Sequence, residues 1–259
     1  MKLAFIGTGN MGSALARAAS CEADNELLLV NRHPEKAERL QKVIGGVVTD
    51  HATAVGTADY IFLGVKPVVL PVLCDTLRPL FRARKERCVI VSMVAGVTVE
   101  RIQAELGTTL PVIRIMPNTP VAVGEGMILY SCSEEVSPEE LERFLKAMGK
   151  AGRFMKVEER LMEAGMAVSG CGPAYVDLFV EALADAAVAS GLQRKDAMVL
   201  AAQMVLGSAK LILESGRHPG ELKDAVCSPG GTTIQGVRAL EAHGFRSAVI
   251  EAVIAARDA

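Results

Sequence analysis

The sequence predicts an α/β domain with a doubly wound parallel sheet, followed by a domain made only of helices. The first half of the 259-residue chain alternates short apolar runs with amphipathic helical patterns, as successive βα units do. The strand pattern stops near Val157, and clusters of glycine and proline divide the remainder into helices. Half of the residues are hydrophobic, which is enough for a large core and excludes a disordered chain.

The predicted elements alternate from the start of the chain. Strands are expected at Lys2–Ile6, Leu27–Val30, Tyr60–Val65, Cys88–Val94 and Val112–Met116, with Met127–Tyr130 and Arg153–Val157 as edge strands. Helices are expected at Met11–Ala19, Pro34–Val43, Val68–Leu77, Val99–Leu106 and Pro138–Met148. We therefore place an α/β domain at residues 1–157 and a helical domain at residues 158–259.

The helical half contains a helix that is apolar around most of its circumference. From Tyr175 to Ala189 the only charged residues are Asp177, Glu181 and Asp185, which lie four apart on one narrow stripe. Such a helix must be covered on nearly every side. The helical domain has few residues for this, so we expect a second copy of the chain to cover it in a homodimer. Burial against the first domain of the same chain is the alternative.

Charge and cysteine content narrow the class of protein. The chain has 28 Lys and Arg against 30 Asp and Glu and no basic stripe, so nothing indicates a nucleic-acid partner. Six cysteines without a C-x-x-C pair indicate reduced thiols and a cytoplasmic protein. The apolar start ends at Gly7, too early for a signal peptide, and residues 198–213 contain Gln203 and Lys210 and fall short of a membrane span. No membrane partner is expected.

A glycine-rich turn follows the first predicted strand and opens the first helix. In this G-x-G-x-x-G context, typical of Rossmann-type dinucleotide sites, Gly7 permits the tight turn, Gly9 lets a pyrophosphate approach, and Gly12 lets helix and strand pack closely. The pyrophosphate would rest on free N–H groups at the helix start. A glycine turn without a ligand is the alternative. The residues predicted to bind the dinucleotide here are Gly7, Thr8, Gly9, Asn10, Met11 and Gly12.

The end of the second strand favours NADP(H) over NAD(H). An NAD site presents Asp or Glu roughly 20 residues after the glycines, whereas this chain has Asn31-Arg32-His33-Pro34. Arg32 is predicted to pair with a 2′-phosphate, and Asn31 to donate a hydrogen bond to it. The alternatives are a solvated Arg32 and the use of NADH.

Two proline-containing loops follow later strands, at the sheet edge where parallel sheets bind ligands. Val65, Lys66 and Pro67 are predicted to lie beside the cofactor, with Lys66 as a catalytic acid, an anion clamp or a solvated side chain. Asn118, which stands in the Met116-Pro117-Asn118-Thr119-Pro120 loop, is predicted to hydrogen-bond the nicotinamide or the substrate. A turn-capping Asn118 is the alternative.

Two segments of the helical half make a resemblance specific. Ser169-Gly170-Cys171-Gly172-Pro173-Ala174-Tyr175 is followed by His218-Pro219-Gly220 and Ser228-Pro229-Gly230-Gly231-Thr232-Thr233. Together with the glycine turn and the two loops, in this order, they resemble pyrroline-5-carboxylate reductases over nearly the whole chain. The resemblance implies reduction of 1-pyrroline-5-carboxylate to L-proline by hydride transfer from NADPH or NADH, the last step of proline biosynthesis. It also implies a helical substrate-binding and dimerisation domain similar to the C-terminal domain of 6-phosphogluconate dehydrogenase.

The last of these segments is the predicted substrate site. Ser228 suits a helix N-cap and Pro229 the first helical position, so the residues after them would offer unpaired N–H groups to an anion. The resemblance implies that the loop holds the substrate carboxylate and that the catalytic Thr233 hydrogen-bonds the ring nitrogen. A helix cap without a ligand is the alternative. The predicted substrate-binding residues are Ser228, Gly230, Gly231, Thr232 and Thr233.

Other side chains receive structural interpretations. Cys171 stands where related reductases commonly have serine, and we interpret it as a small packing residue and not a nucleophile. His218 is interpreted as structural and Tyr175 as a core or interface aromatic, although Tyr175 could also shape the substrate pocket. The histidines show no metal-ligand spacing, so no metal is expected.

Two other functions stay open from the residues alone. A β-hydroxyacid-type dehydrogenase, or another imine reductase, shares the two-domain arrangement, but the dehydrogenase would need a general base in its helical domain. A non-catalytic NADP-sensing module is the alternative of a different class.

Overall fold

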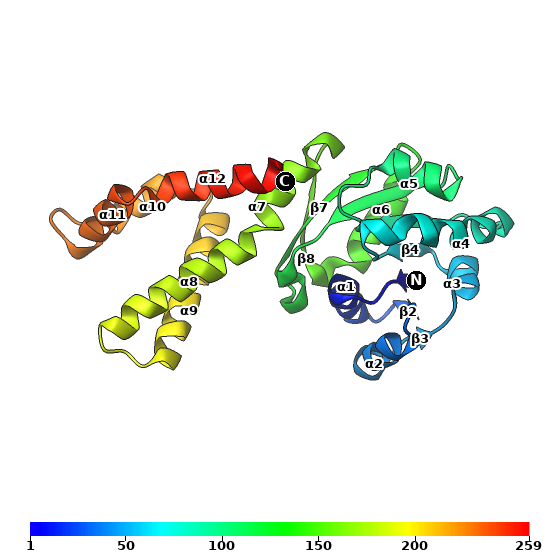
Figure 1. The fold of residues 1–259 in the computed structure, drawn as a ribbon, viewed down its shortest axis with the longest axis horizontal. Coiled ribbons are helices and arrows are strands. Elements are labelled where there is room, and N and C mark those ends of the chain that lie inside the picture. Colours follow the sequence, from blue (N-terminus) through cyan, green and yellow to red (C-terminus); the bar gives the residue numbers. More distant parts are fainter. Residues whose placement is uncertain (259) are drawn as a thin grey trace. The chain divides into compact units, whose positions relative to one another are not determined.

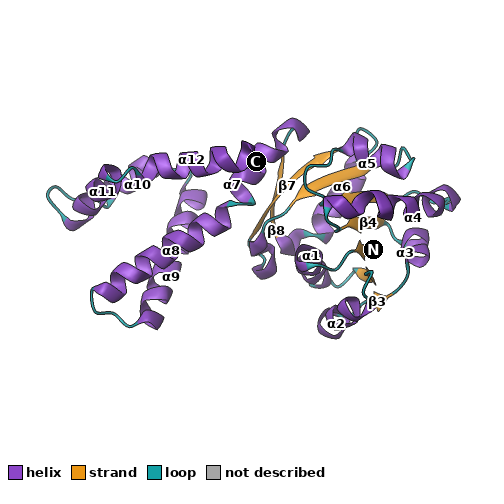
Figure 2. Cartoon of the chain, in the orientation of Figure 1, coloured by secondary structure: helices purple, strands orange, loops and turns teal. Residues whose placement is uncertain are grey.

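A computed structural model describes residues 1–258, and the chain divides into two compact units, Met1–Gly170 and Cys171–Ala259 (Figure 1). All the strands in the described part of the chain lie in the first unit (Figure 2). Its strands are β1 (Lys2–Ile6), β2 (Glu26–Val30), β3 (Val47–Val48), β4 (Tyr60–Leu63), β5 (Val89–Ser92), β6 (Val112–Met116), β7 (Gly126–Cys132) and β8 (Gly152–Lys156). Its helices are α1 (Asn10–Ser20), α2 (Pro34–Ile44), α3 (His51–Thr57), α4 (Leu70–Ala83), α5 (Val99–Leu106), α6 (Pro138–Ala147) and α7 (Met162–Ser169). Short 3-10 helices are η1 (Pro67–Val69), η2 (Thr119–Val123), η3 (Gly149–Ala151) and η4 (Glu159–Leu161).

The eight strands form one sheet in the order β3-β2-β1-β4-β5-β6-β7-β8. Every neighbouring pair is parallel except β6 and β7, so the predicted doubly wound sheet is confirmed. The prediction that Met127–Tyr130 is an edge strand is wrong, because β7 lies between β6 and β8. The short elements β3 and α3 were not predicted.

Both faces of the sheet are buried, and β1 shows how. Its alternate residues Leu3 and Phe5 belong to a core formed with α1, α2 and α6. Ala4 and Ile6 belong to a second core, formed with α3, α4 and α5 on the opposite face. Burying a side chain of this size stabilises the fold by about 1.5–3 kcal/mol. The sheet is therefore a rigid base for the loops at the carboxyl ends of its strands.

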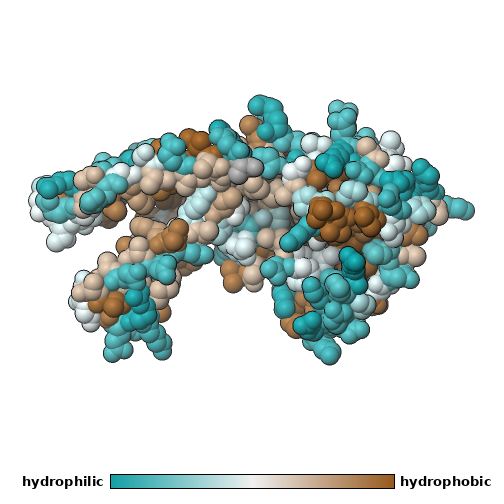
Figure 3. All heavy atoms as spheres, viewed as in Figure 1, coloured by the Kyte–Doolittle hydropathy of each residue, from teal (hydrophilic) through white to brown (hydrophobic). Residues whose placement is uncertain are grey.

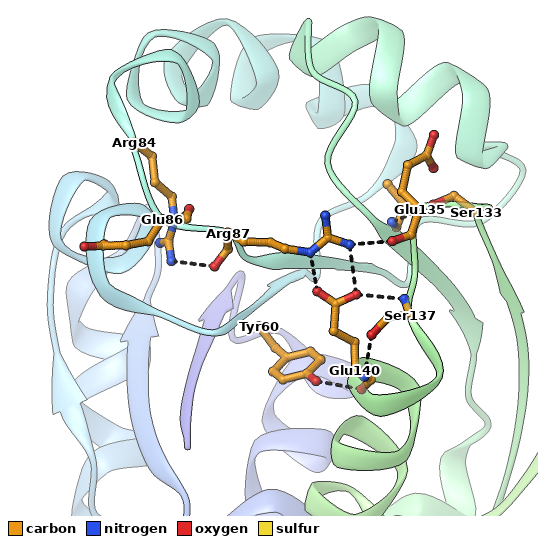
Figure 4. A network of polar contacts seen from close by, with 9 residues as sticks. Tyr60, Arg84, Glu86, Arg87, Ser133, Glu135, Ser137 and Glu140 are labelled. Atoms are coloured by element: carbon orange, nitrogen blue, oxygen red, sulfur yellow. Dashed lines mark hydrogen bonds and ion pairs between the residues drawn. The ribbon is translucent and has the colours of Figure 1, made fainter.

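A polar network ties the opposite, amino-terminal ends of β4 and β5 to α6 (Figure 4). Arg87 donates from Nε and Nη2 to the two carboxylate oxygens of Glu140, at 2.6 and 3.1 Å. Glu140 also accepts from the backbone N–H of Ser137, and Tyr60 donates its hydroxyl proton to the Glu140 carbonyl. The bond from Arg87 holds the pKa of Glu140 below its usual range, and burial raises the pKa of Tyr60 to about 12. These groups stabilise the fold and lie away from the predicted site.

The N-terminal unit extends beyond the predicted boundary because α7 packs on the sheet. Arg114 of β6, which is 3% exposed, pairs with Glu159 at 3.2 Å and with Glu163 at 2.5 Å. Met162 is buried with Met116 of β6 and Leu129 of β7. The compact unit that contains the sheet therefore includes α7 and ends at Gly170.

Over residues 171–258, the C-terminal unit consists of five helices with almost no buried side chains in the single chain. They are α8 (Gly172–Ala189), α9 (Arg194–Ser215), α10 (Pro219–Ala225), α11 (Thr232–Ala242) and α12 (Phe245–Asp258). Within residues 171–258 only Ala184, Ala197 and Ala201 are buried. Apolar surface, drawn tan and brown in Figure 3, runs along these helices. Another surface must cover it for the unit to have a core.

One of these helices bears on the prediction about membranes. By length and composition alone, α9 is long and apolar enough to cross a membrane, so the prediction that this stretch falls short is wrong on that criterion. It is the one such helix among residues 1–258. A helix that packs in a protein core or interface passes the same test, so the observation is weak evidence for a membrane span.

Candidate active site

The glycine turn lies at the carboxyl end of β1, where the predicted dinucleotide site begins. Gly7 has φ +100°, a conformation that favours glycine, and its N–H donates to the Val30 carbonyl of β2 at 2.8 Å. A Cβ on Gly12 would come within 3.0 Å of the Gly7 carbonyl oxygen, so Gly12 lets α1 approach the turn. The Thr8 carbonyl accepts from the Ser13 hydroxyl, which fixes the turn to the helix.

Gly9 has a different environment from the other two glycines. A Cβ placed on it would meet no heavy atom within 4 Å. Gly9 is the N-cap of α1, no side chain caps the helix, and its first turn has no acidic residue. The N–H groups of Asn10, Met11 and Gly12 precede the first intrahelical bond, from Ser13 to Gly9. The open space and the free donors together make a cradle for an anion.

The end of β2 is bound to this turn through Asn31. Its Nδ2 donates to the Thr8 hydroxyl at 2.7 Å, and its Oδ1 accepts from the His33 N–H at 3.0 Å. Arg32 is exposed and has no ion-pair partner within residues 1–258. The structure therefore brings Asn31 and Thr8 together and leaves the guanidinium of Arg32 available to a ligand.

Two cations that were not singled out from the sequence lie beside the same turn. Arg17 of α1 and Lys36 of α2 line a hollow together with Thr8, Gly9 and Asn10. Helix spacing could have indicated Arg17, because it lies one turn after Ser13 on the same face of α1. Lys36 could not be found in this way, because its place beside α1 depends on how the two helices pack.

The loop after β4 meets the glycine turn directly. The Gly64 N–H donates to the Ile6 carbonyl at 2.8 Å, and a Cβ on Gly64 would lie 2.7 Å from the Gly7 carbonyl oxygen. Val65, Lys66 and Pro67 follow, with Lys66 at the N-cap of η1 and exposed. The structure thus gathers three of the predicted cofactor segments at one edge of the sheet.

Asn118 differs from the free amide that the sequence suggested. Its Nδ2 donates to the Ser169 carbonyl at 2.9 Å, and its Oδ1 accepts from the Met127 N–H at 2.8 Å. The side chain is buried, and both of its hydrogen bonds are to backbone groups, one in α7 and one in β7. Asn118 is the N-cap residue of η2, but its side chain does not cap that turn, so the turn-capping alternative is wrong. The side chain instead joins β7 to the end of α7.

The predicted substrate segment lies in the C-terminal unit and begins its helix later than expected. The prediction that Ser228 is the N-cap and Pro229 the first helical residue is wrong, because α11 begins at Thr232 with Gly231 as its N-cap. The physical reason is Gly230, whose φ of +68° cannot belong to a right-handed helix. The Gly231 N–H donates to the Ser228 carbonyl at 3.0 Å and closes a turn.

This turn leaves the start of α11 open. No side chain caps the helix, and no acidic residue stands in its first turn. Thr232 and Thr233 are exposed, and the first-turn N–H groups have no intrahelical acceptor. The turn requires glycine at position 230, whose φ is +68°, whereas a Cβ on Gly231 would require the Ser228 hydroxyl to rotate away. The helix start can still receive a carboxylate.

The remaining side chains have structural partners. His218 is the N-cap of α10, and its Nδ1 accepts from the Gly220 N–H at 3.0 Å, which confirms its structural interpretation. The Tyr175 hydroxyl donates to the Ala252 carbonyl at 3.1 Å, between α8 and α12. All six cysteines are free, and burial raises the pKa of Cys74 and of Cys88 to about 11, so neither is a reactive thiolate.

Known proteins resemble this chain along its whole length. A family model described as pyrroline-5-carboxylate reductase dimerisation matches residues 159–259, and one described as NADP oxidoreductase coenzyme F420-dependent matches residues 2–96. The pyrroline-5-carboxylate reductase of Escherichia coli is 41% identical over 97% of this chain and 94% of its own. That of Synechocystis is 42% identical over 99% of this chain and 96% of its own.

Solved structures give the same result. A pyrroline-5-carboxylate reductase from Coxiella burnetii has a TM-score of 0.89 and 32% identity, covering 99% of this chain and 96% of its own. A Plasmodium falciparum pyrroline carboxylate reductase, solved with NADP bound, has a TM-score of 0.87 and 29% identity. It covers 100% of this chain and 96% of its own.

Proposed function

This chain belongs to the pyrroline-5-carboxylate reductase family, and on that premise we propose a site in which two helix starts hold two anionic ligands. The chain is an NAD(P)H-dependent oxidoreductase that reduces 1-pyrroline-5-carboxylate to L-proline, the last step of proline biosynthesis. The assignment of roles to its residues depends on one observation, the pair of uncapped helix starts at α1 and at α11.

The first helix start is assigned to the cofactor. The cradle at Gly9 and the free N–H groups of α1 fit a pyrophosphate, and the exposed Arg32 fits a 2′-phosphate. We assign Asn31 to holding the end of β2 on Thr8, and the segment Val65 to Pro67 to a place beside the cofactor. Bound NADPH supplies the hydride that the imine carbon receives.

The second helix start is assigned to the substrate. The N–H groups at Thr232 and Thr233 suit a carboxylate, which the helix dipole also attracts. The turn from Ser228 to Gly231 holds these donors in place. We assign the Thr233 hydroxyl to a hydrogen bond with the ring nitrogen, where the product needs a proton. A protonated imine is already a good electrophile, so the main task of the protein is to orient the two reactants. In general, orientation can contribute roughly 7–11 kcal/mol to lowering such a barrier.

A homodimer through the helical unit is part of the proposal. The three buried alanines cannot form a core for five helices, and the family model that matches this region is described by its dimerisation. On α9, Val199, Leu206 and Leu213 recur every seven residues and are 57–69% exposed. The free cysteines fit a cytoplasmic location.

The dimer is tested by Leu206→Asp, with Ser208→Asp on the same helix as the control. Sedimentation velocity should give a smaller species for Leu206→Asp and an unchanged dimer for the control. If Leu206→Asp is still a dimer with full thermal stability, the row formed by Val199, Leu206 and Leu213 is not part of the interface.

The activity is tested by following the loss of NADPH absorbance in the presence of 1-pyrroline-5-carboxylate. Thr233→Val, which removes the hydroxyl but keeps the shape, should lower kcat by about 10- to 100-fold. Thr233→Ser should retain most of the activity, and both variants should bind NADPH as the native protein does. Full turnover in Thr233→Val would reject the role of this hydroxyl, whereas no turnover by the native protein would reject the reductase.

A further inference from the structure

The hollow between α1 and α2 holds more positive charge than the assigned cofactor contacts use. Arg17 of α1 lines it together with Lys36 and Arg39 of α2. It adjoins Thr8 and extends to Gly9 at the start of α1. Among residues 1–258, no aspartate or glutamate lines either part. The hollow is therefore a cationic extension of the phosphate turn.

Helix spacing directs these cations to one place. Arg17 is four residues after Ser13, which bonds to the Thr8 carbonyl, so both lie on the same face of α1. Lys36 and Leu40 have the same spacing on α2, and Leu40 is buried in the core that α1 shares. The charged groups consequently converge from two helices that the core holds rigidly.

The charges of Arg17 and Lys36 are not neutralised within the described chain. Neither has an ion-pair partner among residues 1–258. The nearby carboxylate of Glu35 does not pair with them and lies 3.9 Å from the His33 side chain. Arg39 is partly occupied, since its Nε donates to the Glu35 carbonyl at 3.2 Å. Two cations without counter-ions beside a helix start suit a doubly charged anion, and a phosphate monoester carries a charge of about −1.5 to −2 at neutral pH.

We propose that Lys36 and Arg17 bind the 2′-phosphate of NADP(H) together with Arg32 and so set the preference for the phosphorylated cofactor. The inference rests on the proposed cofactor site. Its link to that site is Thr8, which lines the hollow and also receives the hydrogen bond from Asn31, the residue before Arg32. Selectivity then depends on three cations, one each from α1, α2 and the end of β2, and not on the end of β2 alone.

The experiment compares the binding of two cofactor fragments to the full-length protein by calorimetry. Adenosine 2′,5′-bisphosphate and 5′-AMP differ only in the 2′-phosphate. Lys36→Gln should weaken the bisphosphate by about tenfold or more and change 5′-AMP little, and Arg17→Gln should act in the same direction. Lys36→Arg should keep the preference because it keeps the charge. Lys42→Gln is the matched control, since Lys42 is exposed on α2 but does not line the hollow.

The inference is overturned if Lys36→Gln and Arg17→Gln both keep the native ratio of affinities within about twofold. Loss of the ratio in Arg32→Gln alone would then assign the 2′-phosphate to the end of β2. It is also overturned if Lys42→Gln lowers the ratio as much as Lys36→Gln, because the effect would then come from net charge. These results leave the reductase activity untouched, which fails only if the native protein does not oxidise NADPH with the substrate.

Discussion

Replacing Gly9 and Gly12 separately by alanine distinguishes the ligand-binding role of the glycine turn from its structural role. At Gly9 the added methyl group enters open space, and the backbone, at φ −73° and ψ −169°, is one that alanine adopts. At Gly12 the methyl group would come within 3.0 Å of the Gly7 carbonyl oxygen. Because both groups belong to the backbone framework, no side-chain rotation relieves this collision.

The two substitutions should therefore differ in stability. Alanine is a poorer N-cap than glycine, which lowers stability slightly. It also reduces the conformational entropy of the unfolded chain, which raises the free energy of unfolding by about 0.4–1 kcal/mol. Gly9→Ala should therefore be nearly neutral. Gly12→Ala should cost about 1–3 kcal/mol or more, as overpacked sites do. For a unit of this size, each kcal/mol lowers the melting temperature by roughly 2–4 °C.

The affinity for NADPH should fall in Gly9→Ala, although this variant keeps nearly native stability. A methyl group on Gly9 occupies the cradle, and losing one charge-assisted hydrogen bond costs about 1.5–3 kcal/mol, equivalent to roughly 10- to 100-fold in affinity. Circular dichroism melting and NADPH fluorescence titration measure the two quantities. Gly56→Ala is the control, since its added methyl group also meets open space but lies in α3. Native NADPH affinity in Gly9→Ala, or a stability loss equal to that of Gly12→Ala, would refute the cradle.

Two further predictions concern ion pairs of the N-terminal unit. Replacing Glu159 and Glu163 together by Gln leaves Arg114 buried without a carboxylate, so the free energy of unfolding measured in urea should fall by about 3–5 kcal/mol. Arg114→Met should lower it less, because the two carboxylates are 30% and 42% exposed and return to water. The reverse order would refute this reasoning. Glu140→Gln should lower the free energy of unfolding by about 1 kcal/mol at neutral pH. Since Arg87 lowers the pKa of Glu140, this stability is present above the ordinary value of 4.5 and is lost as the pH falls through the folded-state pKa, so melting curves of native and variant proteins should converge in acid.

Elements with a strong local signal were predictable from the sequence, and elements defined by distant partners were not. The run Val112–Met116 is buried on both faces and was assigned with its observed bounds. β3 has only two residues and α3 only seven, too few for a hydrophobic period to emerge. The central place of β7 depends on which strands pair, which the local pattern of its residues does not encode.

The candidate site shows the same division. The glycine turn was predictable because each glycine answers a local steric need, and Gly7 and Gly12 do so in the structure. The start of α11 was misplaced because Ser-Pro is a common helix opening, whereas the left-handed backbone of Gly230 moves the first turn to Thr232. Lys36 was missed because its importance comes from facing α1 across a hollow, a relation that the sequence of α2 alone does not contain.

Asn118 shows why polar residues after buried strands are ambiguous. Arg114, Met116 and Asn118 alternate along β6 and the residues that follow it, and each engages α7 or the segment leading into it. Arg114 pairs with Glu163, Met116 packs with Met162, and Asn118 donates to the carbonyl of Ser169, the last residue of the helix. Alternate residues of β6 and of the loop that follows it therefore hold the start and the end of α7. A ligand-binding amide and a backbone-binding amide look identical at this position in a sequence, and only the placement of α7 on the sheet distinguishes them.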